Sequence, residues 1–342
     1  MDSHTNSRSA LRQLRLVALA LACCIMTMMA AAGDTIHPEP PAMPTEVTLQ
    51  IAILDVDGID SSEQTFTANV FFRAQWHDPR LAGRYEQASV MPLASVWNPE
   101  LQIVNQQKLW HTLPERVTVY PDGLVTYTQR VWGDFSQPLN LRSFPLDQQL
   151  FEIRITVVEY VEGEIVFKAA QGADISGIAD ALSLSDWEIL SHNVDFTPYH
   201  PYEGLEPSPS MALQFEARRL LGYYLMKILI PLLFIVGMSY LVFWIPVAES
   251  STRISISITA MLTLIAYRFM IGDLLPKVSY MTRLDTFIML CTTLVFCSLI
   301  HAALSGVVDG GHSERALKLD HRARWLFPLT LVAVAVYSYT LW

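Results

Sequence analysis

The sequence predicts an antiparallel β-sandwich followed by a bundle of four membrane-spanning helices. Residues 45–217 contain short runs of alternating apolar and polar residues separated by Gly, Pro and Asp turns, which is typical of a sandwich. The stretches 222–245, 287–308 and 325–342 are apolar, carry a single charge at Lys227, and are each long enough to span a bilayer. The chain of 342 residues is 51% hydrophobic and 16% charged, which is too apolar for an ordinary soluble protein.

The first 32 residues resemble a secretory signal peptide. Arg8, Arg12 and Arg15 precede an apolar run that ends in three alanines at 30–32, a small-residue pattern typical of a cleavage site. An uncleaved signal anchor is the alternative. We expect a signal peptide at 1–32, a linker at 33–44, a ligand-binding sandwich at 45–217 and a transmembrane domain at 218–342. Its helices are expected at about 220–245, 252–272, 284–308 and 324–342, with a cytoplasmic loop at 309–323.

The segment 250–269 reads SSTRISISITAMLTLIAYRF and alternates like a strand in its first half. Among membrane spans it must be a helix, because every backbone polar group in lipid has to be bonded within the protein. On a helix, one stripe within an arc of about 80° carries two hydroxyl residues followed by apolar ones. The stripe consists of Ser255, Thr259, Leu262, Ala266 and Phe269.

This stripe is typical of a water-filled pore closed by a hydrophobic constriction. The alternative is that the hydroxyls bond the helix backbone or a neighbouring helix. Arg253 at one end and Asp273 at the other favour the pore, because they lie where an ion would be attracted or repelled. Glu249, further out beside Pro246, is the acid nearest to Arg253 and is expected at the same mouth. One helix cannot enclose a pore, so we expect a homo-oligomer.

Composition excludes several other functions. Cys23, Cys24, Cys291 and Cys297 all lie outside the sandwich, so no disulfide can stabilise that domain. The net charge of −10 argues against nucleic acid as a partner. We find no nucleophile triad, metal-ligand cluster or phosphate-binding loop, and therefore expect neither an enzyme nor a cofactor or metal. A non-conducting membrane sensor or transport-accessory protein remains a competing class.

Four motifs carry a family resemblance over residues 45–342. They are WHDPRL at 76–81, WNPE at 97–100, FPLDQQ at 144–149, and the order Arg219, Pro231, hydroxyl-rich span, Leu275-Pro276. Together they resemble the prokaryotic pentameric ligand-gated ion channels of the Cys-loop receptor superfamily, here without the two cysteines of that loop. The resemblance implies a homopentamer around a central pore, in a bacterial inner membrane, with the N-terminal domain in the periplasm.

The resemblance also implies a ligand site between neighbouring sandwiches. Arg73 would hold a carboxylate through its planar guanidinium, whereas Glu159 would hold an amine. Val157 and Val158 stand where relatives have an aromatic ring, so an amino-acid-like ligand, another small molecule and protons all remain open. The ligand-binding residues implied are Phe71, Arg73, Trp97, Val158, Glu159, Phe196, Tyr199 and Tyr202.

By the same resemblance, a junction between the domains transmits binding to the pore. The residues implied are Asp57, Phe144, Pro145, Asp147, Arg219, Pro276 and Lys277. For the sign of the permeant ion, bacterial relatives and the acidic chain slightly favour cations. However, Arg253 follows Ser251 and Thr252 rather than an acid, so anions are the alternative. The expected partners are further copies of the chain, a small agonist, permeant inorganic ions and the bilayer.

Overall fold

The computed structural model describes residues 39–170, 174–272, 275, 277–307 and 314–340. The expected signal peptide, part of the linker, Asp273 and Pro276 lie outside the described residues. Residues 94–98 belong to a different unit from residues 41–93 and from the described residues after 98.

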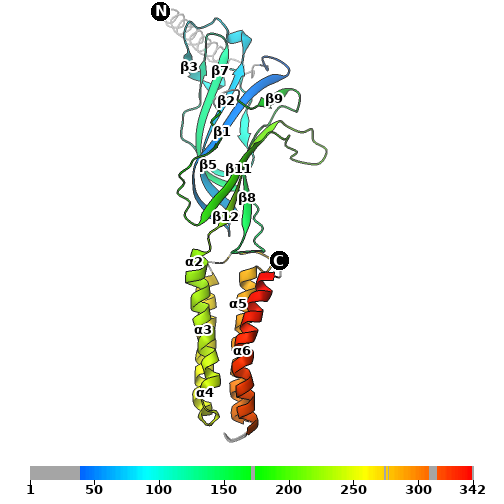
Figure 1. Cartoon of the computed structure of the whole chain (residues 1–342). Helices are drawn as coiled ribbons and strands as arrows, with labels where there is room; N and C mark the ends of the chain where they lie inside the picture. The colour runs from blue at the N-terminus through cyan, green and yellow to red at the C-terminus, as the bar shows by residue number, and fades with distance from the viewer. Residues whose placement is uncertain (1–38, 171–173, 273–274, 276, 308–313, 341–342) are drawn as a thin grey trace, which may run out of the picture. The chain divides into compact units, whose positions relative to one another are not determined.

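Within the described residues, twelve strands precede the helices (Figure 1). They are β1 (Thr45–Asp60), β2 (Thr65–His77), β3 (Ser89–Pro92), β4 (Leu101–Ile103), β5 (Gln106–His111), β6 (Arg116–Val119), β7 (Leu124–Ser136), β8 (Gln148–Val157), β9 (Ile165–Lys168), β10 (Gly177–Ile178), β11 (Trp187–Asp195) and β12 (Ser210–Arg219).

The strands form two sheets, which confirms the predicted sandwich. The larger runs β10-β1-β2-β7-β6-β3, with β5 also on β7 and β9 also on β1, and the smaller runs β11-β12-β8-β4. Burial alternates along the whole of β2, as its sequence pattern predicts. Most strand pairs are antiparallel, whereas β9 and β10 pair with β1 in parallel, which makes the larger sheet mixed.

Aromatic rings from both sheets fill the sandwich core. Phe66 on β2 lies 5.3 Å from Phe151 on β8, and Phe151 stacks on Phe215 of β12 at 5.0 Å, measured between ring centroids. All three side chains are buried. These contacts join the sheets, because each ring buries a large apolar area at an offset or edge-on geometry.

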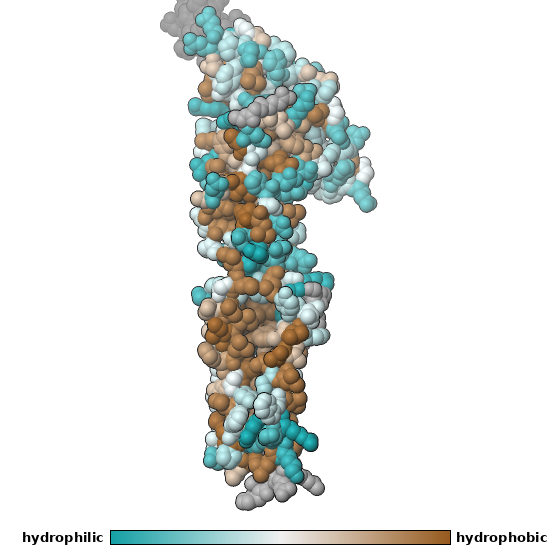
Figure 2. All heavy atoms as spheres, viewed as in Figure 1, coloured by the Kyte–Doolittle hydropathy of each residue, from teal (hydrophilic) through white to brown (hydrophobic). Residues whose placement is uncertain are grey.

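The helices follow as α2 (Gly222–Tyr224), α3 (Ile230–Leu241), α4 (Ser250–Ile271), α5 (Arg283–Val307) and α6 (Glu314–Thr340). Three stretches are long and apolar enough to cross a membrane: Gly222–Trp244, Val247–Ile271 and Arg283–Ser305. The described part of the fourth expected span, residues 324–340, lies within α6, and this helix begins at Glu314, inside the loop expected at 309–323. Figure 2 shows hydrophobic side chains gathered over the helices, whereas hydrophilic ones are interspersed over the strands.

A proline shapes the first span. Pro231 follows a π-helical turn at Leu225–Leu229 and lacks the N–H that would bond the Lys227 carbonyl. The hydroxyl of Tyr267, on α4, lies 3.3 Å from that carbonyl oxygen and donates to the Ile228 carbonyl at 2.7 Å. The side chain of a neighbouring helix thus bonds the backbone at the proline site, as the low polarity of a membrane requires.

Candidate functional site

The stripe predicted to line a pore is exposed along its whole length on α4. Leu262 is 61% and Phe269 81% exposed, and Ser255, Thr259 and Ala266 are exposed as well. The opposite face is buried against the other helices of the chain. The buried side chains are Arg253, Ser257, Ala260, Leu264, Tyr267 and Ile271.

The hydroxyl of Thr259 combines the two roles that the sequence suggested as alternatives. It donates to the Ser255 carbonyl at 2.8 Å, and Thr263 in turn donates to the Thr259 carbonyl at 2.7 Å. Because its proton is directed to the backbone, the exposed Thr259 oxygen keeps acceptor capacity for a partner outside the helix.

Arg253, which the sequence predicts at a pore mouth, is not exposed at the end of α4 in the structure. Its side chain is 0% exposed, and its Nη2 donates to Asp320 Oδ1 on α6 at 2.7 Å. On a helix, Arg253 points about 160° away from Ser255. A buried guanidinium needs a counter-charge, and the nearest one belongs to α6, which draws Arg253 into the bundle.

Glu249 is the charged residue that remains exposed at this end of α4. It occupies the N-cap position and makes no capping hydrogen bond through its side chain. Acidic groups are favourable at helix N-termini. The other expected mouth residue, Asp273, lies outside the described residues.

On the larger sheet, Phe71 and Arg73 lie on the same face of β2. Both are half-buried, whereas the intervening Phe72 points into the core. The Arg73 guanidinium carbon lies 5.8 Å from the Phe71 ring centroid. Among the described residues no hydrogen bond or ion pair is found for Arg73, so its donors remain available to a ligand.

On the smaller sheet, the connection between β11 and β12 forms the expected hairpin. Tyr199 and Ser208 exchange two backbone hydrogen bonds of 2.8 and 3.0 Å. Tyr202, near the tip, is 73% exposed, and Phe196 is half-buried. The hairpin therefore presents aromatic side chains at the sandwich surface.

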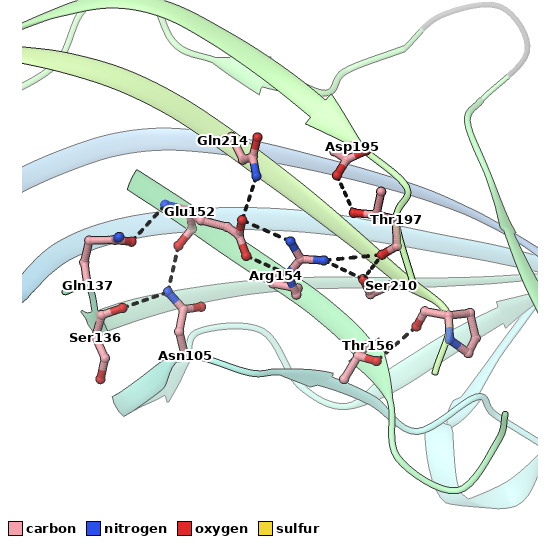
Figure 3. A network of polar contacts seen from close by, with 11 residues as sticks. Asn105, Ser136, Gln137, Glu152, Arg154, Thr156, Asp195, Thr197, Ser210 and Gln214 are labelled. Atoms are coloured by element: carbon pink, nitrogen blue, oxygen red, sulfur yellow. Dashed lines mark hydrogen bonds and ion pairs between the residues drawn. The ribbon is translucent and has the colours of Figure 1, made fainter. Parts of the chain in front are cut away.

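A polar network anchors the base of this hairpin (Figure 3). Arg154 on β8 forms a bidentate pair with Glu152 at 2.6 and 3.0 Å, and donates to Ser210 Oγ at 2.8 Å and to the Thr197 carbonyl at 3.3 Å. Its guanidinium also lies 6.0 Å from the Tyr199 ring. The same strand thereby holds both ends of the hairpin.

The network favours the ionised form of the Glu152 carboxyl. Burial raises the pKa of its carboxyl, but hydrogen bonds from Arg154 and Gln214 and the charge of Arg154 outweigh burial, so the net pKa lies below the ordinary value. A cavity of about 260 Å³ opens beside the network, lined by Asn105, Glu152, Arg154 and Tyr199 among others.

Val158 and Glu159 follow β8 directly, and both are exposed. The loop that they begin reaches the hairpin, because the Glu162 N–H donates to the Pro207 carbonyl at 2.9 Å. Trp97 belongs to the separate segment 94–98, and its side chain is buried. Within one chain, the hairpin side and the Arg73 side thus belong to different sheets.

Arg219, at the end of β12, is the centre of a buried cluster. Its guanidinium bonds both carboxylate oxygens of Asp147, at 2.9 and 3.2 Å, and donates to Ser61 Oγ at 2.9 Å and Tyr224 Oη at 3.2 Å. The guanidinium carbon lies 4.1 Å from the Trp187 ring centroid and 4.8 Å from that of Phe144. The Arg219 side chain thus contacts residues of β11, of two turns and of the first span.

Asp57 does not contact Arg219; its carboxylate accepts a hydrogen bond of 2.6 Å from the indole of Trp132. The residue of this region that bonds Arg219 is Ser61, in the turn after β1. Two bulges in the pairing of β1 with β2 shift the register between Ile53 and Gly58, and single-strand reasoning cannot locate such shifts.

The loop that carries Phe144 also contacts the start of α5. The Leu284 N–H donates to the Phe144 carbonyl at 3.3 Å, the Arg283 N–H to the Arg142 carbonyl at 3.0 Å, and the Leu141 N–H to Tyr280 Oη at 2.9 Å. Pro145 follows a cis peptide bond and lines an apolar cavity of about 340 Å³ with Tyr224 and others. Lys277 is exposed, and Pro276 lies outside the described residues.

Sequence reasoning missed Tyr267, Tyr280, His301 and Asp320. The sequence placed Asp320 in the loop expected at 309–323, whereas the structure places it on α6, where a buried acid needs a partner. The partner itself could not be inferred, since 67 residues separate Asp320 from Arg253.

Comparison with known protein families agrees with this arrangement. The chain matches the neurotransmitter-gated ion-channel ligand binding domain over residues 33–220 and the neurotransmitter-gated ion-channel transmembrane region over residues 228–309. The first match alone covers more than half of the chain. Members of this superfamily are homo- or heteropentameric ligand-gated channels and not enzymes. The chain therefore belongs to the neurotransmitter-gated ion-channel family, with an extracellular ligand-binding sandwich followed by a helical transmembrane region.

Proposed function

We propose that the chain forms a homopentameric channel whose pore is lined by Ser255, Thr259, Leu262, Ala266 and Phe269. The observation that carries this proposal is the exposure of all five side chains on α4, opposite the face that packs within the chain. An exposed stripe with hydroxyls at one end and large apolar groups towards the other suits a hydrated path with a gate that closes by dewetting.

The proposed channel conducts cations. Arg253, the cationic group nearest the inner end of the stripe, is buried and paired with Asp320, so it contributes little positive potential to a pore. Glu249 remains exposed there, and Thr259 offers an oxygen acceptor within the stripe. A mouth lined by one sign of charge raises the local concentration of the opposite ion.

The proposed agonist binds between subunits and carries a carboxylate. Arg73 on one subunit would face the hairpin at residues 196–209 of the next, and its unpaired guanidinium can bind a carboxylate through two hydrogen bonds. Glu159 and the exposed Tyr202 would complete the site from the hairpin side. An amino acid carries both of the charges that these groups would bind.

In the proposed arrangement, the ligand-binding domain lies in the periplasm of a bacterial inner membrane. The first span then runs inward, α4 begins at the cytoplasmic side, and α6 returns outward as a fourth span. Arg219 and the Phe144 loop would transmit hairpin movement to the first span and to α5 through the contacts described above.

Bilayer recording of Leu262→Ser tests the pore. A hydroxyl in place of the exposed leucine should favour water in the constriction and produce leak current or altered gating. Leu329→Ser is the matched control, because Leu329 on α6 is 67% exposed but lies outside the proposed pore, and it should leave the currents unchanged. A salt gradient then gives the sign of the permeant ion.

The recordings should include a panel of amino acids, small carboxylates and amines, and a range of pH. If neither the wild type nor Leu262→Ser carried current under any of these conditions, the channel proposal would fail and a non-conducting sensor would be favoured. A reversal potential at the anion limit would overturn cation selectivity alone.

A further inference from the structure

A buried ion pair joins the inner end of α4 to α6. The Arg253 side chain is 0% exposed and that of Asp320 3% exposed, with 2.7 Å between Nη2 and Oδ1. His301 on α5 places its Nε2 2.7 Å from the same oxygen. Side chains from α4 and α5 therefore contact the same carboxylate oxygen on α6.

Asp320 is the anionic partner that the structure gives Arg253. Within the described part of the chain, the Arg253 Nε and Nη1 atoms are buried without a hydrogen-bond partner. The guanidinium thus depends on one charge-assisted hydrogen bond for its retention in the bundle. Removing one member of a buried pair leaves an uncompensated charge, which is far less favourable than removing both.

The surroundings hold Asp320 in place rather than hydrating it. The ring of Phe243 lies edge-on to His301 at 5.1 Å, and Arg324, one turn after Asp320 on α6, donates to the Phe243 carbonyl at 2.9 Å. Arg324 also stacks over Trp244 at 4.7 Å. These contacts fix the register of α6 against the end of the first span, and with it the position of the carboxylate.

We infer that Asp320, although it lies outside the pore, is a positioning residue for ion selectivity. It draws Arg253 away from the inner mouth and cancels its charge, so that Glu249 sets the net charge of each subunit there. This inference rests on the proposed pore. Without Asp320, each subunit would present one exposed anion and one uncompensated cation at the mouth.

Without Asp320, the Arg253 guanidinium would lie close to the aqueous boundary. Arg253 is the fourth residue of α4, so it lies within about one helical turn of the cytoplasmic end. Long cationic side chains extend to the nearest aqueous boundary when they lose a buried partner. An Arg253 released from Asp320 would therefore reach the mouth where Glu249 is exposed.

The test is the reversal potential of Asp320→Asn in a salt gradient, with neutral pH on both sides and wild type and Leu262→Ser recorded in parallel. We expect the cation-to-anion permeability ratio to fall about tenfold or more, because a ring of cations would then oppose the Glu249 ring. The double variant Arg253→Gln/Asp320→Asn should return to the wild-type ratio, since it removes both charges.

The double variant decides the matter if Asp320→Asn does not assemble. If Arg253→Gln/Asp320→Asn keeps the wild-type cation-to-anion permeability ratio and single-channel conductance, Arg253 is held outside the permeation path, as inferred. If the double variant is more cation-selective than the wild type, Arg253 already faces ions in the wild type, and the inference is wrong. A conducting Asp320→Asn with the wild-type ratio would overturn it as well. Absence of current in wild type and Leu262→Ser would instead refute the proposed channel.

Discussion

At the scale of single residues, burial decides what a charged side chain does in this protein. Arg218 and Arg219 are neighbours on β12 and both form ion pairs, Arg218 with Glu188 and Arg219 with Asp147. The first pair is half exposed, and the second is almost completely buried. Exposed pairs contribute little to stability because water screens them, whereas a broken buried pair leaves a charge that nothing solvates.

Asp147→Asn should therefore lower the free energy of unfolding by about 3–5 kcal/mol. The Arg219 guanidinium would keep its place among the rings of Trp187 and Phe144 without a counter-charge. Thermal unfolding of the protein in lipid nanodiscs would measure the loss. Glu188→Gln is the matched control and should cost less than about 1 kcal/mol; equal effects of the two variants would contradict this account.

Glu152 gives the sandwich a pH-dependent contribution to stability. Its pKa in the folded protein lies below the ordinary value of 4.5, so the stabilisation is fully present above about pH 4.5 and is lost as the pH falls towards the folded pKa. Unfolding followed between about pH 6 and pH 3 should show a smaller acid-induced loss for Glu152→Gln than for the wild type.

Gln214→Ala provides a graded comparison for that measurement. It removes one hydrogen bond that lowers the Glu152 pKa, so it should reduce the acid-induced loss by less than Glu152→Gln does. Identical pH profiles for wild type and Glu152→Gln would rule out this carboxylate as a source of the pH dependence.

At the scale of elements, a proline and a tyrosine determine the hydrogen bonds between the first span and α4. Tyr267→Phe removes the hydroxyl that bonds the backbone at Lys227 and Ile228. A buried carbonyl without a partner costs about 1–3 kcal/mol, so this variant should unfold at a lower temperature than wild type.

The Pro231→Ala background tests whether the missing N–H at Pro231 is the reason that Tyr267→Phe destabilises the protein. Alanine at 231 supplies the N–H that the helix lacks beside Lys227, so Tyr267→Phe should cost less in that background than in the wild type. Four-way comparison of unfolding free energies gives the coupling directly. Additive effects would mean that Tyr267 and Pro231 act independently.

At the scale of the whole molecule, the proposed ligand site is divided between two surfaces. The hairpin connects two strands of the smaller sheet, and Val158 and Glu159 follow a third, whereas Phe71 and Arg73 lie on a strand of the larger sheet. The proposed pore is incomplete in the same way, since one α4 provides one face of it. Under the proposed function, one subunit carries the residues of both sites but completes neither, and association of identical subunits would supply the remainder.

The sequence by itself determined the sandwich, the membrane spans and the family, because hydrophobic periodicity and the need to satisfy backbone hydrogen bonds in lipid act locally along the chain. It also located the stripe on α4. Only the tertiary structure decided which charged side chains are buried in ion pairs and which are exposed. Arg253 and Arg219 have their acidic partners 67 and 72 residues away, and Ser61, in the turn after β1, bonds Arg219 as well. A buried guanidinium must have a counter-charge, but the chain alone does not say which acid the packing of helices and strands will bring to it.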